Sequence, residues 1–127
     1  IDGAVIVTTP QEIALIDARK AAAMFAKVNV GILGVIENMS YFLCPGDGVR
    51  YPIFGEGGGQ REAERLGVPL LGKVPIDIPT RSAGDNGLPI TLATLEEKND
   101  DSNPAASVFH ETSKKLAAIL AAQDEAS

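Results

Sequence analysis

Three apolar runs without polar alternation divide the first part of the chain. They read AVIVTT (residues 4–9), VGILGVIE (30–37) and PLLGKVP (69–75). Continuous runs of this length are typical of parallel strands that are covered on both faces. Between them, segments 11–28 and 60–67 have the apolar spacing of helices. This order predicts an α/β fold whose strand–helix–strand crossovers are right-handed.

The ends of the two helices are marked by particular residues. Thr9 is expected to cap the first helix, with Pro10 in its first turn. Glu12 follows Thr9 by three residues, which is the spacing of a capping box. Gly67 is expected to end the second helix, because glycine adopts the left-handed conformation of a helix terminus without strain.

The last third of the chain has a weaker pattern. Glycine and proline interrupt residues 80–103, which predicts a surface loop with at most one turn of helix. Within it we expect a short strand at 90–93 (ITLA) and a flexible acidic loop at about 94–103. From Asn103 onward a final helix is predicted, because the following apolar residues form one stripe: Val108, Phe109, Leu116, Ile119 and Leu120.

Composition limits the classes of function. A chain of 127 residues that is 45% hydrophobic can bury one core, so one domain is expected. With 17 acidic and 11 basic side chains its net charge is −6, which argues against nucleic-acid and membrane partners. A single cysteine allows no internal disulfide, and no signal peptide or membrane span is recognisable. These features favour a cytoplasmic protein that binds small molecules or other proteins.

Polar residues follow each predicted strand, where open α/β sheets bind their ligands. Asn38 follows the second strand, and its amide can donate and accept at once, which matches the N6/N7 edge of adenine. Its alternative role is that of a turn former. Asp77 follows the third strand and is more often the cap of a following turn. For Thr9, a helix-capping role is favoured over a catalytic role.

The glycines at 55, 57, 58 and 59 suggest a phosphate-binding loop, but the required G-x-x-x-x-G-K-[ST] pattern is absent. Gln60 and Arg61 follow the cluster, and the chain's one Gly-Lys pair, Gly72-Lys73, is followed by Val74. We therefore interpret residues 55–59 as a flexible loop that leads into a helix.

A lone cysteine lies in the sequence Cys44-Pro45-Gly46-Asp47. One thiolate and one carboxylate are a weak metal-site pattern, and a small apolar filler is the commoner role of a single cysteine. The Pro-Gly-Asp-Gly stretch predicts a tight turn, with residues 41–43 and 49–51 as the arms of a hairpin. His110 is solitary, so a solvated or helix-edge role is favoured over ligation.

Five segments in order resemble the carboxyl-terminal half of the Mrp/ApbC family of iron–sulfur cluster carrier ATPases, which belongs to the MinD/ParA superfamily of P-loop proteins. The resembling segments are DGAVIVTTPQEIALIDARKA (2–21), GVIENMSYFLCP (34–45), IFGEGGG (53–59), LGVPLLGKVPID (66–77) and RSAGDNGLPI (81–90). They cover nearly the whole chain.

The resemblance implies a partial three-layer P-loop NTPase fold, with a mainly parallel sheet flanked by helices and the amino-terminal half missing. Residues 1–127 would be the carboxyl-terminal part of one ATPase domain, with a hairpin carrying the metal loop at about 41–55. The loops that bind ATP phosphates and Mg²⁺ would precede Ile1, so no catalytic residue is expected here and this chain alone is expected not to hydrolyse ATP. Asn38, Pro75 and Asp77 correspond to the adenine side of the pocket.

The resemblance also implies a homodimer that holds an iron–sulfur cluster between subunits and passes it to apo iron–sulfur client proteins. Cys44 matches a cluster ligand of the family, whereas Asp47 stands where many relatives have a second cysteine. Two copies would then offer two thiolates and two carboxylates, and the harder carboxylates would weaken cluster binding.

Two alternative functions belong to other classes. The first is a metal-free MinD/ParA-like switch that keeps nucleotide-driven dimerisation. The second is a non-catalytic dimerisation module that uses the hairpin from Tyr41 to Phe54.

Overall fold

The structure is a computed structural model that describes residues 1–44, 46–92 and 103–126. Its helices and strands have the following bounds: β1 Ala4–Thr8, α1 Glu12–Lys27, β2 Ile32–Glu37, β3 Phe42–Leu43, β4 Arg50–Tyr51, α2 Gly58–Leu66, β5 Leu70–Lys73, α3 Ile78–Asp85 and α5 Pro104–Ala126. The three predicted strands, the two helices between them, the hairpin and the last helix are all present.

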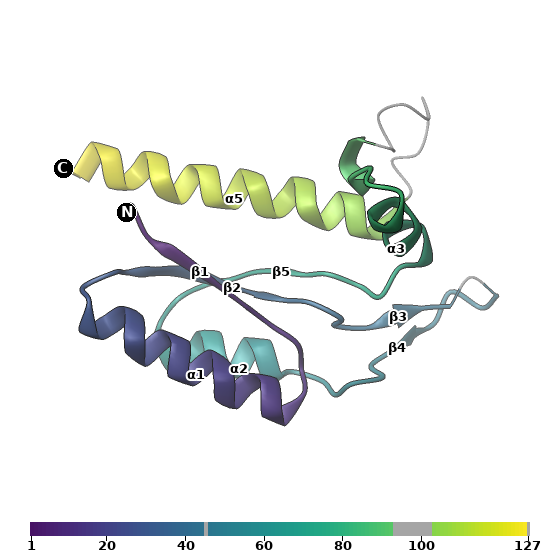
Figure 1. The fold of residues 1–127 in the computed structure, drawn as a ribbon, viewed down its shortest axis with the longest axis horizontal. Coiled ribbons are helices and arrows are strands. Elements are labelled where there is room, and N and C mark those ends of the chain that lie inside the picture. Colours follow the sequence, from purple (N-terminus) through teal and green to yellow (C-terminus); the bar gives the residue numbers. More distant parts are fainter. Residues whose placement is uncertain (45, 93–102, 127) are drawn as a thin grey trace.

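The main sheet has the strand order β1-β2-β5, and both of its pairings are parallel. α1 and α2 cover one face of this sheet, whereas α5 lies on the opposite face (Figure 1). Ile6 of β1 and Val35 of β2 pack against Ala18 and Ala63 of the two helices in a buried cluster. The predicted α/β sheet flanked by helices is therefore confirmed.

The predicted capping box of the first helix is wrong. α1 begins at Glu12 with Gln11 as its N-cap, and no side chain caps it. The Thr9 hydroxyl instead donates to the Gln11 Oε1 atom at 3.2 Å. Because the chain turns through Pro10 before the helix begins, Thr9 lies too far from the first free amides to accept from them.

The prediction of a loop after the third strand is also wrong, because α3 occupies Ile78–Asp85. Asp77 is its N-cap, and its side chain accepts a hydrogen bond from the Thr80 amide at 3.0 Å. Pro79 lies in the first turn, where a missing N–H costs nothing. These local signals start the helix despite the glycine at position 84.

Residues 90–92 are helical, which overturns the strand predicted at 90–93; residue 93 and the predicted acidic loop at 94–102 lie outside the described residues. The Leu92 amide donates to the Pro89 carbonyl at 3.0 Å, as in a helical turn. Pro89 favours this start, and no strand of the described sheet borders the segment to pair with it. β-branched residues alone do not make a strand without such a partner.

Side chains of α5 cover part of β5, which is one edge strand of the sheet. The Leu71 carbonyl of β5 accepts hydrogen bonds from the Thr112 hydroxyl at 3.2 Å and from Lys115 Nζ at 3.4 Å. Such side chains discourage edge-to-edge association with another sheet. No helix in the described part of the chain is long and apolar enough to cross a membrane.

A buried ion-pair cluster fastens α2 to α1. The side chain of Glu62 is only 2% exposed, and it accepts hydrogen bonds from Arg65 and from Arg19 Nε, the latter at 3.1 Å. Its pKa is lowered chiefly by the Arg65 guanidinium, with Arg19 adding to the effect and burial opposing it. The carboxylate therefore stays ionised below the usual pH range of glutamate.

We predict that Glu62 makes the fold sensitive to acid. Its contribution to the free energy of unfolding is complete above the ordinary glutamate pKa of 4.5 and is lost as the pH falls through its lower folded pKa. Glu62→Gln is expected to cost about 1–2 kcal/mol at neutral pH, since both guanidinium groups are half exposed and remain hydrated. Chemical denaturation between about pH 3 and about pH 7 measures both effects.

The matched control is Glu111→Gln, which removes an exposed pair with Lys114 and should have little effect at any pH. Equal pH dependence of the wild type and the Glu62→Gln variant would contradict the prediction.

Candidate functional site

The carboxyl ends of β1, β2 and β5 point toward the end of the molecule where the β3–β4 hairpin and α3 lie, on the right of Figure 1. Here the chain leaving β2 and the chain leaving β5 run side by side. The Ser40 amide donates to the Val74 carbonyl at 3.0 Å. The Ile76 amide donates to the Tyr41 carbonyl at 2.7 Å. This ladder joins the predicted base-binding segments to the hairpin that carries Cys44.

Asn38 is half-buried at the end of β2, as predicted for a strand-end site. Its backbone amide donates to the backbone carbonyl of Thr8 in β1 at 2.7 Å, and its side-chain Oδ1 accepts from the Met39 backbone amide at 2.9 Å. Met39 has a φ of 52°, in the left-handed region that few residues other than glycine adopt. Oδ1 keeps a second lone pair, so the side chain can still accept and donate. Asn38 borders a groove of about 470 Å³ between β1 and α1.

Pro75 and Asp77 lie in the chain that leaves β5. Pro75 is buried. Asp77 Oδ2 accepts from the Thr80 hydroxyl at 2.5 Å and from Asn103 Nδ2 at 3.0 Å, in addition to the Thr80 amide. Asp77 thus has the capping role that the sequence offered as the alternative to ligand binding. Its hydrogen bond from Asn103 also ties the start of α5 to α3. Contact of Pro75 and Asp77 with a base stays a prediction.

Glu37 is a residue that sequence reasoning missed. It ends β2, immediately before Asn38, and is only 1% exposed. Its Oε2 accepts from the Ser40 hydroxyl at 3.1 Å, and its Oε1 accepts from the Gly59 amide at 3.4 Å. A buried carboxyl group needs such partners, because its desolvation is otherwise costly. The available signal was an acidic residue that closes an otherwise apolar run.

The interpretation of residues 55–59 as a flexible loop is only partly right. Gly58 and Gly59 form the first turn of α2 and are buried, and only the preceding glycines belong to a loop. A Cβ atom on Gly59 would lie 2.9 Å from the Glu37 Cβ, and one on Gly58 would lie 2.9 Å from Leu15 Cδ1. These glycines allow close helix packing, and the Gly59 amide at the start of α2 donates to the protein's own Glu37 carboxylate.

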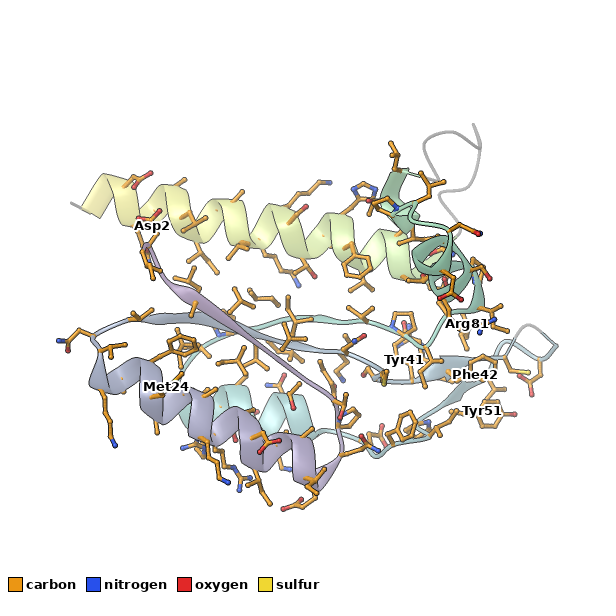
Figure 2. The ribbon with its side chains drawn as sticks, viewed as in Figure 1. Asp2, Met24, Tyr41, Phe42, Tyr51 and Arg81 are labelled. Atoms are coloured by element: carbon orange, nitrogen blue, oxygen red, sulfur yellow. The ribbon has the colours of Figure 1, made fainter. Side chains whose placement is uncertain are left out.

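The predicted hairpin is confirmed, with β3 and β4 antiparallel. The Cys44 amide donates to the Val49 carbonyl at 3.1 Å, and the Gly48 amide donates to the Cys44 carbonyl at 2.9 Å. The Cys44 side chain is half-buried and forms no disulfide. Figure 2 shows Phe42 and Tyr51 on this hairpin, near its tip. Cys44 therefore lies in a tight turn beyond the sheet.

Asp47 is held in the same turn. Its Oδ1 accepts from the Val49 amide at 2.9 Å, and its Oδ2 accepts from the Tyr51 hydroxyl at 2.7 Å. The Tyr51 hydrogen bond is the main cause that lowers the pKa of Asp47, followed by the Val49 amide, and the Cys44 thiol adds a smaller contribution. The same contact raises the pKa of Tyr51. An ionised carboxylate thus lies beside the thiol.

One chain does not complete a metal centre by itself. Within residues 1–44, 46–92 and 103–126, no group of three or more His, Cys, Asp or Glu side chains could hold a metal ion. Cys44 and Asp47 supply one soft and one hard donor, whereas iron–sulfur clusters usually take four thiolates. The described residues of one chain therefore supply fewer donors at this turn than such a cluster usually takes.

A further hollow lies away from these residues. It measures about 550 Å³, is bordered by Thr80, Pro89 and Phe109, and was not predicted. His110 lies at its rim and is exposed on α5, in agreement with the predicted helix-edge role.

The parallel sheet, with helices on both faces and polar groups beyond its strand ends, is the architecture of a P-loop NTPase. MinD from Pyrococcus furiosus shares this fold with a TM-score of 0.65 and 21% identity, over 93% of this chain and 43% of that one. MinD from Aquifex aeolicus gives a TM-score of 0.67 at 19% identity, over 92% of this chain and 44% of that one. A nucleotide-binding protein from Archaeoglobus fulgidus, solved in complex with ADP, has a TM-score of 0.60 and 38% identity over 68% of this chain and 35% of that one.

Residues 1–117 match the family described as "ParA: NUBPL iron-transfer P-loop NTPase", and the chain belongs to this family. The iron–sulfur cluster carrier protein of Pyrococcus furiosus is 50% identical over 116 residues, which are 91% of this chain. The protein of the same name from Deinococcus radiodurans is 53% identical over 96 residues, or 76% of this chain and 27% of its own length. The chain spans 37% of the length of the Pyrococcus relative. The resemblance found in the sequence is thereby confirmed.

Proposed function

We propose that this chain is the base-binding and cluster-binding part of an ATP-dependent iron–sulfur cluster carrier that delivers its cluster to apo-proteins. The observation that carries the proposal is the position of Cys44. It lies in an exposed turn that hydrogen bonds connect to the strand ends beside Asn38. Relatives named iron–sulfur cluster carrier proteins support it with about half of the aligned residues identical.

The proposed nucleotide site is divided along the sequence. Asn38 would recognise the base through its amide, with Pro75 and the backbone near Asp77 as a wall. The groups that hold the ATP phosphates and Mg²⁺ would be contributed by sequence preceding residue 1. Hydrolysis therefore belongs to the full-length protein, and residues 1–127 alone are expected to show no ATP turnover above background.

The proposed cluster site is shared between two copies in a cytoplasmic homodimer. One chain offers the Cys44 thiolate, so a second copy is needed to approach the usual number of ligands. The cluster is cargo in this scheme and leaves with the client protein. Asp47 is a harder donor than a cysteine thiolate and is already hydrogen-bonded to Tyr51, which should make the cluster easier to release than one held by four thiolates.

We predict that Asn38→Ala weakens ATP binding by the full-length protein about tenfold, because one amide hydrogen-bond pair to the base is lost. Calorimetric titration with ATP measures this effect, and anaerobic reconstitution followed by iron analysis tests cluster binding in parallel. Asn86→Ala is the matched control, since Asn86 is exposed at the end of α3. Unchanged affinity in Asn38→Ala would contradict the base-binding role, whereas absence of bound iron in the wild type would contradict the carrier function.

A metal-free nucleotide switch is the second candidate. It is favoured by the engagement of Asp47 with Tyr51 and Val49, because a carboxylate held by these hydrogen bonds is less available to a metal than a free one. Iron analysis after anaerobic purification separates the two functions. A third candidate, the non-catalytic dimerisation module, predicts instead that residues 1–127 dimerise without ATP.

A further inference from the structure

Glu37 holds both ends of the segment that carries Cys44. This segment runs from Ser40, three residues after the end of β2, to Gly59 in the first turn of α2. The Ser40 hydroxyl and the Gly59 amide bind different oxygens of the same Glu37 carboxylate, although Gly59 lies 22 residues away along the chain. One buried side chain therefore clamps the entry and the exit of the hairpin segment.

The clamp lies next to the proposed base contact. Asn38 follows Glu37 directly, and its backbone is tied to Thr8 of β1. On the other side, the Val74 amide donates to the Glu37 carbonyl at 2.7 Å. A displacement of Asn38 by a bound base would therefore reach Glu37, its covalent neighbour, and through the Glu37 side chain both Ser40 and Gly59.

The neighbouring packing leaves little room for the clamp to relax. A Cβ on Gly59 would collide with Glu37, so α2 and the carboxylate are already in direct contact. Closely packed elements transmit shifts as rigid bodies, because protein interiors have few voids to absorb them.

We propose that Glu37 is a positioning residue that couples nucleotide binding at Asn38 to the geometry of the cluster turn at Cys44. The inference rests on the proposed function, because it requires that both ligands bind. It assigns Glu37 no contact with the cluster or with the nucleotide. Its role is to keep Ser40 and Gly59, and hence the two arms of the hairpin, at a defined position relative to Asn38.

The test uses two substitutions of similar size. Glu37→Met removes both acceptors, whereas Glu37→Gln keeps an oxygen for the Gly59 amide and presents an NH₂ group to the Ser40 hydroxyl, which can rotate to accept. If coupling depends on these hydrogen bonds, Gln should preserve it and Met should abolish it. Ser40→Ala, which loses only the entry contact, gives a milder variant should Glu37→Met fail to fold.

The measurement is the rate at which a ferrous-iron chelator removes iron from the reconstituted full-length protein, with and without MgATP. In the wild type and in Glu37→Gln we expect MgATP to change this rate by at least about fivefold, the lower end of typical coupling between two sites. In Glu37→Met the two rates should converge, and in Ser40→Ala, which keeps the Gly59 contact, the ratio of the two rates should fall below that of the wild type. Visible absorption of the cluster and the ATP dissociation constant should stay within about twofold of the wild type, which separates lost coupling from lost binding.

Glu64→Met is the control for the replacement of an exposed carboxylate, which on α2 accepts a hydrogen bond only from the exposed Gln60 side chain among the contacts described, and it should keep the wild-type response. Retained coupling in a folded Glu37→Met variant would overturn the inference, as would loss of coupling in Glu37→Gln. A wild type that binds both ligands but releases iron at one rate would also overturn it and leave the proposed function intact. A wild type that binds no iron or no ATP would overturn both.

Discussion

Full-length protein with Cys44→Ala is expected to show no iron–sulfur absorption in the visible region after anaerobic reconstitution. Cys44 is the only thiol among the 127 residues, and the carboxylate beside it is a poor substitute for a thiolate on cluster iron. The substitution removes from each copy the one thiol that residues 1–127 supply, so the absorption that depends on this turn should be lost. Absorption spectra, bound iron and bound sulfide measure the outcome.

The structure offers a substitution of opposite expected effect. Asp47→Cys places a second thiol in the same turn, in the C-P-x-C arrangement, and should raise iron content and prolong the lifetime of the cluster in air. Tyr51 would lose its hydrogen-bond acceptor, but its side chain is exposed and remains hydrated. If Cys44→Ala retains the wild-type spectrum, the cluster binds elsewhere and the proposed site is wrong.

Gly72→Ala is expected to lower the free energy of unfolding by about 1–3 kcal/mol, the usual cost of overpacking. A Cβ on Gly72 would lie 2.3 Å from Thr112 Oγ1 and 3.1 Å from Val108 Cγ1, so α5 would have to move away from the sheet. The movement would also break the hydrogen bond from Thr112 to the Leu71 carbonyl. Chemical denaturation monitored by circular dichroism measures the loss.

A double mutant distinguishes this collision from a general effect of alanine. Thr112→Ala removes the obstructing oxygen and should cost about 1 kcal/mol on its own. Combined with Gly72→Ala, it should restore part of the stability, so that the two losses do not add. Gly31→Ala is the control, because nothing lies within 4 Å of a Cβ at that position. Additive losses in the double mutant would argue against the contact between β5 and α5.

Most of the fold could be predicted from the sequence. Runs such as AVIVTT and VGILGVIE favour strands wherever they occur, because they can be hidden from water only between two layers. The end of α2 at Gly67 could be predicted too, since glycine adopts the left-handed C-cap conformation observed there. The hairpin followed from its turn residues.

The errors arose where several local signals competed. The Thr9–Glu12 pattern suggested a capping box, but the course of the chain from β1 through Pro10 delayed the helix until Glu12. After β5, glycine and proline suggested a loop, whereas Asp77 joined Thr80 and the distant Asn103 in one hydrogen-bonded group that supports α3. Residues 90–92 are helical because no strand is available to pair with them.

The candidate site divides in the same way. The strand-end position of Asn38 and the turn that contains Cys44 could be predicted, because strand ends and tight turns are marked by local sequence, whereas the proposed roles of both residues stay predictions. Two other contacts could not be predicted from the sequence. They are the hydrogen bond between Asp47 and Tyr51 and the clamp formed by Glu37. Each depends on which side chains meet in space, and the chemistry of a carboxylate changes with the partner it meets.

The sequence by itself determined the three parallel strands, the helices between them and the turn that presents the single thiol. These properties depend on hydrophobic periodicity and on backbone preferences, which neighbouring residues decide. Only the tertiary structure decided that Glu37 joins Ser40 to Gly59, and that Gly72 must lack a side chain because of a threonine on α5. The physical reason is that such contacts join residues far apart in the chain, 41 positions in the case of Thr112 and Leu71, and arise only when the layers pack.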